Sequence, residues 1–547
     1  MWERGAFGRP VSFCGIRSHI TVREGRSFIQ GEPMTAWTEG YVADIPYALG
    51  FYRETVPAHI AFSALAVGKH PGLSLQPKRV LELGIGMGLG FIINAASSPD
   101  TEFEGVDFNP LHIAHSRGLA DAAGLTNVSL REASFQDLAR EAQEGQHDTD
   151  IIVLHGILTW VSADAQEAIV EVARKRLKPG GILYVSYNCM PGWAPVLPLQ
   201  RLMRENAKRV AGRSDVQTGS GMELVQALIT EGAKYFTATP SLAVRVEGML
   251  KHERNYLAHE YLNANWFIFH FADVAAMFGR AKLDFVGSAT IIENMDLLAI
   301  PQGVRPRIAA ESDPIFRETL RDIAINKQFR RDLFARGGSA TTPSEQMGLL
   351  SKMQFALAVP RAKATFKIPS PLGELDGSAD IYGAVLDCLA DGPAALERIV
   401  QLSPFQRAGG IGAALQAVSL LVHSGQVLPA PLVPASDRGP SQRLNRVIAE
   451  KMGQGRTYSF LAAPVVGSGV PATNIELLLL AGILAEPSLG VDALADDLVV
   501  RMGGIGLNWV DEGKTVTDSA ESRSRARRDA DLFLAEKLPL WRQLGVF

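Results

Sequence analysis

The sequence contains little cysteine, with three residues in a chain of 547. Cys14, Cys189 and Cys388 lie far apart, so the chain has no C-x-x-C pair of the kind that binds zinc. An odd number of distant cysteines also argues against a disulfide framework and favours a reducing compartment. We therefore expect a cytoplasmic protein without a metal centre.

Positive charge and long apolar runs are scarce as well. Lysine and arginine total 54 against 58 aspartate and glutamate residues, a formal charge of -4, so no overall basic field would attract nucleic acid. The uncharged run 459–475 is interrupted by prolines and glycines, and the apolar run 477–485 is too short to span a bilayer. We expect neither a nucleic-acid partner nor membrane insertion.

Glycine, in contrast, recurs at every second position of a short segment that ends at Gly90. A backbone without Cβ atoms can turn sharply and approach a ligand closely. A strand over 78–83 and a helix from Gly90 place these glycines at a strand-to-helix turn, where free N–H groups favour an anionic ligand group. Neither the dinucleotide fingerprint G-x-G-x-x-G nor a following G-K-[ST] is present, so those two nucleotide loops are excluded.

The remaining pattern, E-x-G-x-G-x-G from Glu82 to Gly88, resembles the first motif of the Rossmann-like, class I S-adenosylmethionine-dependent methyltransferases. The resemblance implies an α/β fold with S-adenosylmethionine as the cofactor. It also implies that Glu82, Gly84, Gly86 and Gly88 contact this cofactor. A glycine-rich turn without a ligand is the alternative.

The next two strands supply further expected contacts. The run 102–107 ends in Asp107, about twenty residues beyond the loop, and this spacing places a carboxylate where it can accept hydrogen bonds from the ribose hydroxyls. Phe108 follows it and is included in the expected cofactor site. A strand over 127–133 precedes Ser134 and Phe135, where the resembling family has its adenine contacts. Many members have an acid in place of Ser134, and a core position is an equal alternative for Phe135.

Aromatic residues ahead of the first strand often fold over the cofactor in methyltransferases of this type. Tyr47 and Tyr52 precede a helix expected from about Thr55, with a proline in its first turn, and both are lid candidates. Packing on the sheet is the alternative for at least one of them.

A fourth strand ends in another set of candidates. The run 150–154 is apolar enough to be buried on both faces, and His155, Gly156 and Trp160 follow it at the carboxyl edge, where ligands of open α/β sheets bind. His155 is interpreted as a wall or hydrogen-bond contact, with a chemical base as the alternative.

Three motifs narrow the resemblance: H-G-x-x-x-W-V at 155–161, L-K-P-G-G at 177–181 and Y-N-x-x-P-G-W at 187–193. Together they resemble bacterial methyltransferases that carry a regulatory domain, a group that includes the rickettsial protein-lysine methyltransferases. The interpretation that follows gives four residues a part in methyl transfer beside His155: aromatic walls of an acceptor channel at Tyr187, Trp193 and Trp160, and an amide at Asn188 that directs the acceptor amine.

Composition and the resemblance together predict several structural units. The middle unit contains His259-Glu260, but Asn263 leaves the metal motif H-E-x-x-H incomplete, so a buried polar pair between helices is favoured. Stretches rich in glycine, serine or proline at 337–344 and 431–440 are predicted linkers. The expected units are a mobile extension at 1–33, a lead-in and lid at 34–72, a sheet domain at 73–200, a mainly helical middle (regulatory) domain at 201–337, a winged-helix-like domain at 345–430 and a helical domain at 441–547.

Three functions compete at this point. Methylation of lysine amines in a protein is favoured by the resemblance and by the large extra domains, since an apolar aromatic channel would lower the pKa of the amine. The alternatives are N- or O-methylation of a small molecule or peptide natural product, with His155 as base, and a non-catalytic cofactor-binding scaffold. DNA amino-methylation is weaker because [DNS]-P-P-[YFW] is absent. The acceptor, the number of methyl groups and the oligomeric state, a homodimer included, stay open.

Overall fold

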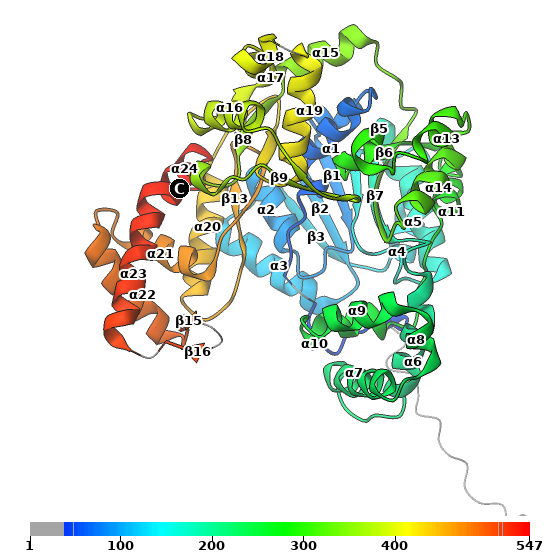
Figure 1. The fold of residues 1–547 in the computed structure, drawn as a ribbon, viewed down its shortest axis with the longest axis horizontal. Helices are drawn as coiled ribbons and strands as arrows, with labels where there is room; N and C mark the ends of the chain where they lie inside the picture. Colours follow the sequence, from blue (N-terminus) through cyan, green and yellow to red (C-terminus); the bar gives the residue numbers. More distant parts are fainter. Residues whose placement is uncertain (1–37, 48, 408, 512–513, 517) are drawn as a thin grey trace, which may run out of the picture.

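The computed structural model describes residues 38–47, 49–407, 409–511, 514–516 and 518–547 (Figure 1). The expected extension at 1–33 lies outside the described residues. At the centre is a seven-stranded sheet in the order β3-β2-β1-β4-β5-β7-β6, in which only β7 runs antiparallel to its neighbours. Its strands are β1 (Arg79–Leu83), β2 (Glu102–Asp107), β3 (Val128–Glu132), β4 (Thr149–Leu154), β5 (Leu177–Asn188), β6 (Leu283–Ser288) and β7 (Phe329–Arg336).

Helices cover both faces of the sheet. Successive side chains of each strand point to opposite faces, so each strand contributes to two core clusters. In β4, Ile151 and Val153 belong to one core cluster and Ile152 and Leu154 to the other. Such unbroken apolar runs are typical of strands buried on both faces. The first cluster contains α1 (Pro57–Ala66), α2 (Leu89–Ser97) and α3 (Pro110–Ala123), and the second contains α4 (Phe135–Glu141), α5 (Ala163–Arg176) and α11 (Phe271–Gly279).

A group of helices with its own small core follows β5. Figure 1 shows this group gathered at one end of the sheet. Its core includes Leu199, Met203, Val225, Val246 and Leu257, all nearly or fully buried. The helices are α6 (Leu197–Ala207), α7 (Ser214–Thr230), α8 (Lys234–Ala238), α9 (Pro240–Met249) and α10 (Arg254–Tyr261).

The two strands at one edge of the sheet come from a part of the chain that the sequence assigns to the middle domain. Strands β6 and β7 lie within 201–337, so the sheet extends beyond the range 73–200 expected for it. The physical reason is that β7 pairs with the edge of β5 from Ile182 to Asn188, which would otherwise stay unpaired. The short helices between β6 and β7 are α12 (Asp296–Ala299), α13 (Arg305–Ala310) and α14 (Pro314–Ala324).

Two further units follow the sheet. The first combines helices with the three-stranded antiparallel sheet β11-β8-β12, as in a winged helix: α15 (Pro343–Lys352), β8 (Gln354–Leu357), the hairpin β9 (Lys367–Ser370) and β10 (Gly373–Asp376), α16 (Ala379–Ala390), β11 (Ala394–Ala395), α17 (Leu396–Val400), α18 (Ser403–Arg407), α19 (Gly410–His423) and β12 (Val427–Ala430). The second is helical, with two hairpins: α20 (Gly439–Met452), β13 (Phe460–Ala463), β14 (Ser468–Pro471), α21 (Asn474–Ala485), α22 (Val491–Gly504), β15 (Val510–Asp511), β16 (Lys514–Thr515), α23 (Ser519–Leu532) and α24 (Leu538–Gln543).

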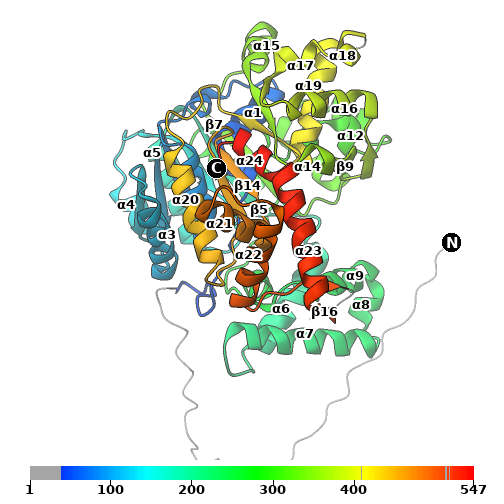
Figure 2. The same ribbon diagram turned by 90° about the vertical axis from the view of Figure 1, so that its left-hand side faces the viewer.

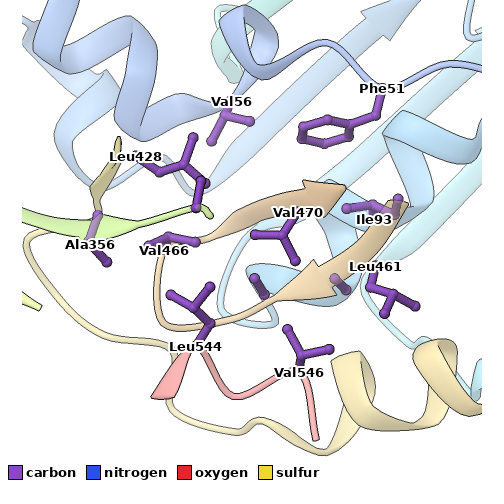
Figure 3. Packing of buried hydrophobic residues seen from close by; sticks show 14 of the residues in the cluster. Phe51, Val56, Ile93, Ala356, Leu428, Leu461, Val466, Val470, Leu544 and Val546 are labelled. Carbon is purple, nitrogen blue, oxygen red and sulfur yellow. The ribbon is translucent and has the colours of Figure 1, made fainter. Parts of the chain in front are cut away.

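These C-terminal units share one hydrophobic core with the first face of the sheet. Helix α20 packs on α2 and α3, and Figure 2 shows α20 to α23 side by side over this face. In Figure 3, Val470 of β14 and Leu461 of β13 lie between Phe51, Ile93 of α2 and Val546. The predicted linkers are also held in place, since Thr341 N donates to Gly68 O and Ser436 Oγ to Asp100 Oδ1.

The expected fold class is therefore confirmed: a Rossmann-like α/β sheet with a mainly helical middle domain and C-terminal helical and winged-helix-like units. Among the described residues, no helix combines the length and the apolar character needed to cross a bilayer.

Candidate functional site

The glycine loop after β1 has the backbone conformation that its sequence predicts. Gly84, Gly86 and Gly88 have φ angles of +76°, +56° and +73°, a region that side chains with Cβ rarely adopt. A Cβ on Gly84 would lie 2.4 Å from Ile157 Cδ1, and one on Gly88 only 1.9 Å from Ser116 Oγ. At Gly86 the nearest atom is Tyr47 Cδ1 at 3.8 Å. Two of the glycines therefore allow close packing, and Gly86 leaves open space.

This space belongs to a cleft at the carboxyl edge of the sheet. Every residue that the sequence assigns to the cofactor lines it: Tyr47, Glu82, Gly84, Gly86, Gly88, Asp107, Phe108, Ser134, Phe135, His155 and Gly156. Trp160, Tyr52 and Tyr41 line it as well.

Asp107 is fixed at the edge of the cleft by three neighbours. The backbone N–H of Gly86 donates to Oδ2 at 2.9 Å, that of Asn109 donates to Oδ1 at 2.9 Å, and His112 Nδ1 lies 3.0 Å from Oδ1. These contacts fix the orientation of the carboxylate beside the glycine loop. Oδ1 already has two partners, whereas Oδ2 has a second lone pair that can accept from a ligand hydroxyl.

Glu82 lies on the floor of the cleft without a charge partner. None of the described residues forms a hydrogen bond or an ion pair with its carboxylate, and burial raises the pKa of Glu82 to about 8. A carboxylate in such surroundings is costly to ionise unless a cation binds to it. This residue therefore suits a ligand that carries an ammonium group.

Ser134 and Phe135, at the end of β3, differ in their surroundings. Ser134 is the N-cap of α4: its Oγ accepts from Asp137 N at 3.1 Å and donates to Asp137 Oδ2 at 2.6 Å. This short side chain is thus engaged in capping, which is a structural role. Phe135 lines the cleft and also packs against the second core cluster.

His155 closes another side of the cleft. Its Nδ1 lies 2.8 Å from Tyr184 Oη and 3.2 Å from Ser186 Oγ, and the ring of Tyr52 packs on it with a centroid distance of 3.7 Å. Burial lowers the pKa of His155 to about 3, and the Arg331 guanidinium adds to this effect. The imidazole is therefore neutral at physiological pH and suits a wall better than a base.

The N-terminal segment lines the cleft with Tyr41 and Tyr47 and packs on α10, and this packing could be predicted only in part from the sequence. The rings of Tyr41 and Tyr47 pack on His259 with centroid distances of 5.6 and 5.0 Å. His259 thus holds the N-terminal segment rather than joining two helices with Glu260. The sequence indicates a role for Tyr41 only through its position in the same aromatic-rich stretch as Tyr47.

Three expected acceptor residues do not line the cleft. Tyr187 is fully buried and donates to Asp332 Oδ2 at 2.6 Å. Asn188 is 5% exposed, and its backbone N–H donates to Thr159 Oγ1. Trp193 belongs to the core of the α6–α10 group, with the Arg245 guanidinium 3.9 Å from its ring centroid. None of the three is among the residues that line the cleft.

Comparison with known proteins identifies this arrangement. Residues 76–252 match the family model described as a methyltransferase domain, and residues 253–336 match a predicted methyltransferase regulatory domain. An uncharacterized protein of Synechocystis sp., sll1526, is 33% identical over 519 residues, which are 93% of this chain and 99% of that protein. The chain belongs to the class I methyltransferases with a regulatory domain. Its cofactor is S-adenosylmethionine.

Two rickettsial proteins are also similar to the methyltransferase. An uncharacterized protein of Rickettsia prowazekii, RP789, is 25% identical over 315 residues, or 57% of this chain and 55% of that protein. The structure of PKMT2 from Rickettsia typhi in complex with AdoHcy superposes with a TM-score of 0.67 at 19% identity and covers 91% of this chain and all of that one. At this identity the likeness shows a common fold.

The cleft of the methyltransferase fits its cofactor chemically. S-adenosylmethionine combines an ammonium and a carboxylate, a sulfonium, a ribose with two hydroxyls and an adenine. Glu82 offers an unpaired carboxylate, the Gly86 backbone leaves room for close approach, and Asp107 offers acceptors. Phe135 presents an apolar surface to the same cleft. Among the described residues, no cluster of histidine, cysteine or acidic side chains could hold a metal ion.

Proposed function

We propose that this methyltransferase modifies lysine side-chain amines of a protein. The observation that carries the proposal is the extent of the fold likeness to PKMT2, which includes the units beyond the methyltransferase sheet. Those units share a continuous core with the sheet, so they are a permanent part of the enzyme. The resemblance of the motifs around Trp160 and Tyr187 to the rickettsial protein-lysine methyltransferases supports the same acceptor.

The residues of the cleft have separate tasks in this function. When bound, S-adenosylmethionine supplies a methyl group on a sulfonium, which is a good leaving group. Glu82 binds the cofactor ammonium, Asp107 orients the ribose, and the Gly86 N–H stays held by Asp107. Tyr47 and Tyr52 cover the reacting end and exclude water, which strengthens every electrostatic contact inside. Alignment and desolvation are the main needs of such a transfer.

Methylation of a small molecule with His155 as base has less support. A general base works best when its pKa lies near the operating pH, and burial lowers the pKa of His155 to about 3. The ring is also occupied on one face by Tyr52 and at Nδ1 by Tyr184.

Methyl transfer from labelled S-adenosylmethionine to a bacterial cell lysate tests the proposal. We expect label in protein, and peptide mass spectrometry should place the added mass on lysine. The Asp107→Asn variant is the control and should lose the signal. In this variant an NH2 group replaces one carboxylate oxygen and cannot accept hydrogen bonds, so the Gly86 N–H and the ribose cannot both be bound as in the wild type. Label in a metabolite with no lysine gaining mass would contradict the proposal.

A further inference from the structure

A second cavity lies beside the cofactor cleft, where three parts of the chain meet. Its volume is about 380 Å³, which is within the usual range of small-molecule sites. Its walls come from the segment that leads into α1, from the turn after β6 and strand β7, and from the β9–β10 hairpin and the end of α19. Among the described residues, none lines both this cavity and the cofactor cleft.

Arg331 of β7 brings an unpaired positive charge to this cavity. Its Nη1 donates to Thr290 Oγ1 at 3.3 Å, and its guanidinium lies 4.9 Å from the centroid of the Phe329 ring. Its Nε is buried and bonds to no described residue, and none of the described carboxylates forms an ion pair with the guanidinium. A buried donor without a partner costs free energy, which a bound acceptor recovers.

His59 of α1 brings a second unpaired atom to the same cavity. Its Nε2 lies 2.8 Å from Ala289 O, and because a carbonyl oxygen only accepts, Nε2 carries the proton. Burial lowers the pKa of His59, so the ring is neutral and Nδ1 is an acceptor. This Nδ1 has no partner in the part of the chain that the structure describes, although the residue is only 3% exposed. Ala289 N donates to Arg331 O at 2.8 Å, so one residue contacts both His59 and Arg331.

The two carboxylates that line the cavity already have cationic partners. Glu54 Oε1 lies 3.5 Å from Arg53 Nε, and Glu293 forms an ion pair with Lys327. The charge of Arg331 is therefore the one that these pairs leave uncompensated. A cavity of this kind favours an anionic ligand.

The two unpaired atoms also discriminate among anions. A guanidinium binds the oxygens of carboxylate, sulfate and phosphate groups alike. The Nδ1 atom of His59 needs a donor, and at neutral pH neither a carboxylate nor sulfate carries an O–H group. A phosphate ester loses its last O–H near pH 6, at about the second pKa of a phosphoryl group. Inorganic hydrogen phosphate keeps one, so it suits both Arg331 and His59.

We propose that this cavity binds inorganic phosphate, with Arg331 pairing with its negative oxygens and His59 Nδ1 accepting from its P–O–H group. Both atoms that lack a partner in the protein then gain one. The site is separate from the cleft in which methyl transfer takes place, so the assignment goes beyond the proposed function.

Direct contacts connect this site to the wall of the cofactor cleft. Arg331 covers the Phe329 ring, which packs edge-on against His155 at a centroid distance of 6.3 Å. Arg53, in the cavity wall, directly follows Tyr52, which packs on the same imidazole. Bound phosphate holds Arg331, and through Phe329 it supports His155. We therefore expect phosphate and the cofactor to favour each other's binding, by the same factor in both directions.

Calorimetric titration of the full-length protein tests the site. Inorganic phosphate is added near neutral pH, with chloride keeping the ionic strength constant. We expect it to bind at least about tenfold more tightly than sulfate, which has the same shape but no O–H group, since an unpaired buried acceptor costs about 1–3 kcal/mol. Glycerol phosphate should also bind more weakly. Equal binding of phosphate and sulfate, or no binding at millimolar concentration, would overturn the proposal, and tighter binding of glycerol phosphate would overturn the assignment to the inorganic ion.

Three variants locate the binding. Arg331→Gln should weaken phosphate binding about ten- to a hundredfold, the usual loss for a hydrogen bond to a charged group. Arg307→Gln removes an exposed arginine of α13 and is the matched control, which should bind as the wild type does. His59→Gln keeps a donor for Ala289 O but lacks Nδ1, so it should lose the preference for phosphate over sulfate. Unchanged phosphate binding in Arg331→Gln would place the ion elsewhere and reject the site. If a variant folds poorly, the comparison of phosphate with sulfate on the wild type still decides.

The connection to the cleft has its own measurement. Saturating phosphate should tighten the binding of S-adenosylhomocysteine to the wild type by about fivefold or more, the lower end of typical coupling between sites. The same titration in chloride alone is the reference, and Arg331→Gln should lose the effect. Identical affinities with and without phosphate would reject the coupling.

Discussion

The ring of Tyr52 lies 3.7 Å from the ring of His155, centroid to centroid, with the planes tilted by 30°. Tyr52 precedes α1, and His155 ends β4, so this contact holds the N-terminal segment over the cofactor cleft. The neighbouring residue, Phe51, packs on Phe460 of β13 at 5.1 Å. The C-terminal unit thus supports the cover of the cleft through two adjacent aromatic residues.

A substitution in β14 should therefore reduce activity from a distance. A Cβ on Gly469 would lie 2.8 Å from Phe51 Cε2, so Gly469→Ala must displace Phe51 and with it Tyr52. We expect methyl transfer to fall about tenfold or more, since misplaced positioning groups are costly. Steady-state kinetics checks this, with Gly503→Ala as control, because a Cβ there meets no atom within 4 Å. Equal rates for both variants would show that Phe51 adapts without moving Tyr52.

Gly86→Ala should separate cofactor binding from folding. The φ angle of +56° strains an alanine by about 1–2 kcal/mol, which a protein of this size tolerates, but the added methyl group points into open cleft space. We expect calorimetry to give at least tenfold weaker binding of S-adenosylmethionine, which corresponds to a loss of about 1.4 kcal/mol in binding free energy. Gly118→Ala, on the exposed side of α3, is the control and should bind normally.

The pH dependence of the rate distinguishes the two roles considered for His155. Because burial lowers its pKa to about 3, this side chain keeps the same charge from about pH 5 upward. We expect His155→Gln to lower the rate through loss of the Tyr52 contact and to leave the shape of the pH–rate profile unchanged. Disappearance of a limb near neutral pH in the variant would instead identify His155 as a base.

Stability of the cofactor-free protein should fall as the pH rises. Burial raises the pKa of Glu82 from 4.5 to about 8, so between these values the folded protein holds a proton that the unfolded chain has released. Unfolding then releases a proton and becomes easier at higher pH. We expect Glu82→Gln to flatten this dependence and to melt higher than the wild type at about pH 8. Calorimetric melting from about pH 5 to about pH 8 tests it, and a steeper fall in the variant would contradict it.

A buried ion-pair network should be important for the edge of the sheet. Arg330 of β7 is 3% exposed and donates to Asp332, Asp322 and Glu318, so it links β7 to α14. Arg330→Met should cost about 3–5 kcal/mol in unfolding free energy, because it leaves buried carboxylates unpaired. Arg280→Met, which breaks an exposed pair with Glu167, should cost about 1 kcal/mol or less. Denaturant unfolding compares them, and similar losses would contradict the argument.

Much of the cleft could be predicted from the sequence because its parts are local. The glycines after Leu83 require their own backbone conformation, and Asp107 stands at the end of a strand whose apolar pattern is plain. Gly84 to Gly88 and Asp107 then meet because parallel neighbours in such a sheet end at one edge.

The acceptor side could not be predicted in the same way, because it depends on distant pairing. Strand β5 runs on to Asn188, and β7 pairs with Tyr187 and Asn188 through Arg330 and Phe329, so these side chains lie within the sheet layers. Nothing local to β5 indicates this partner.

The antiparallel strand β7, which lies between β5 and β6, affects how the protein folds during synthesis on the ribosome. When β1 to β5 have emerged, β5 still presents an unpaired edge, and its partner β7 is completed only once Arg336 has been translated. Until then, the nascent chain carries an open strand next to a half-built core. Chaperones that shield such edges should therefore improve the yield of this enzyme, and pausing between Asn188 and Phe329 should lower it.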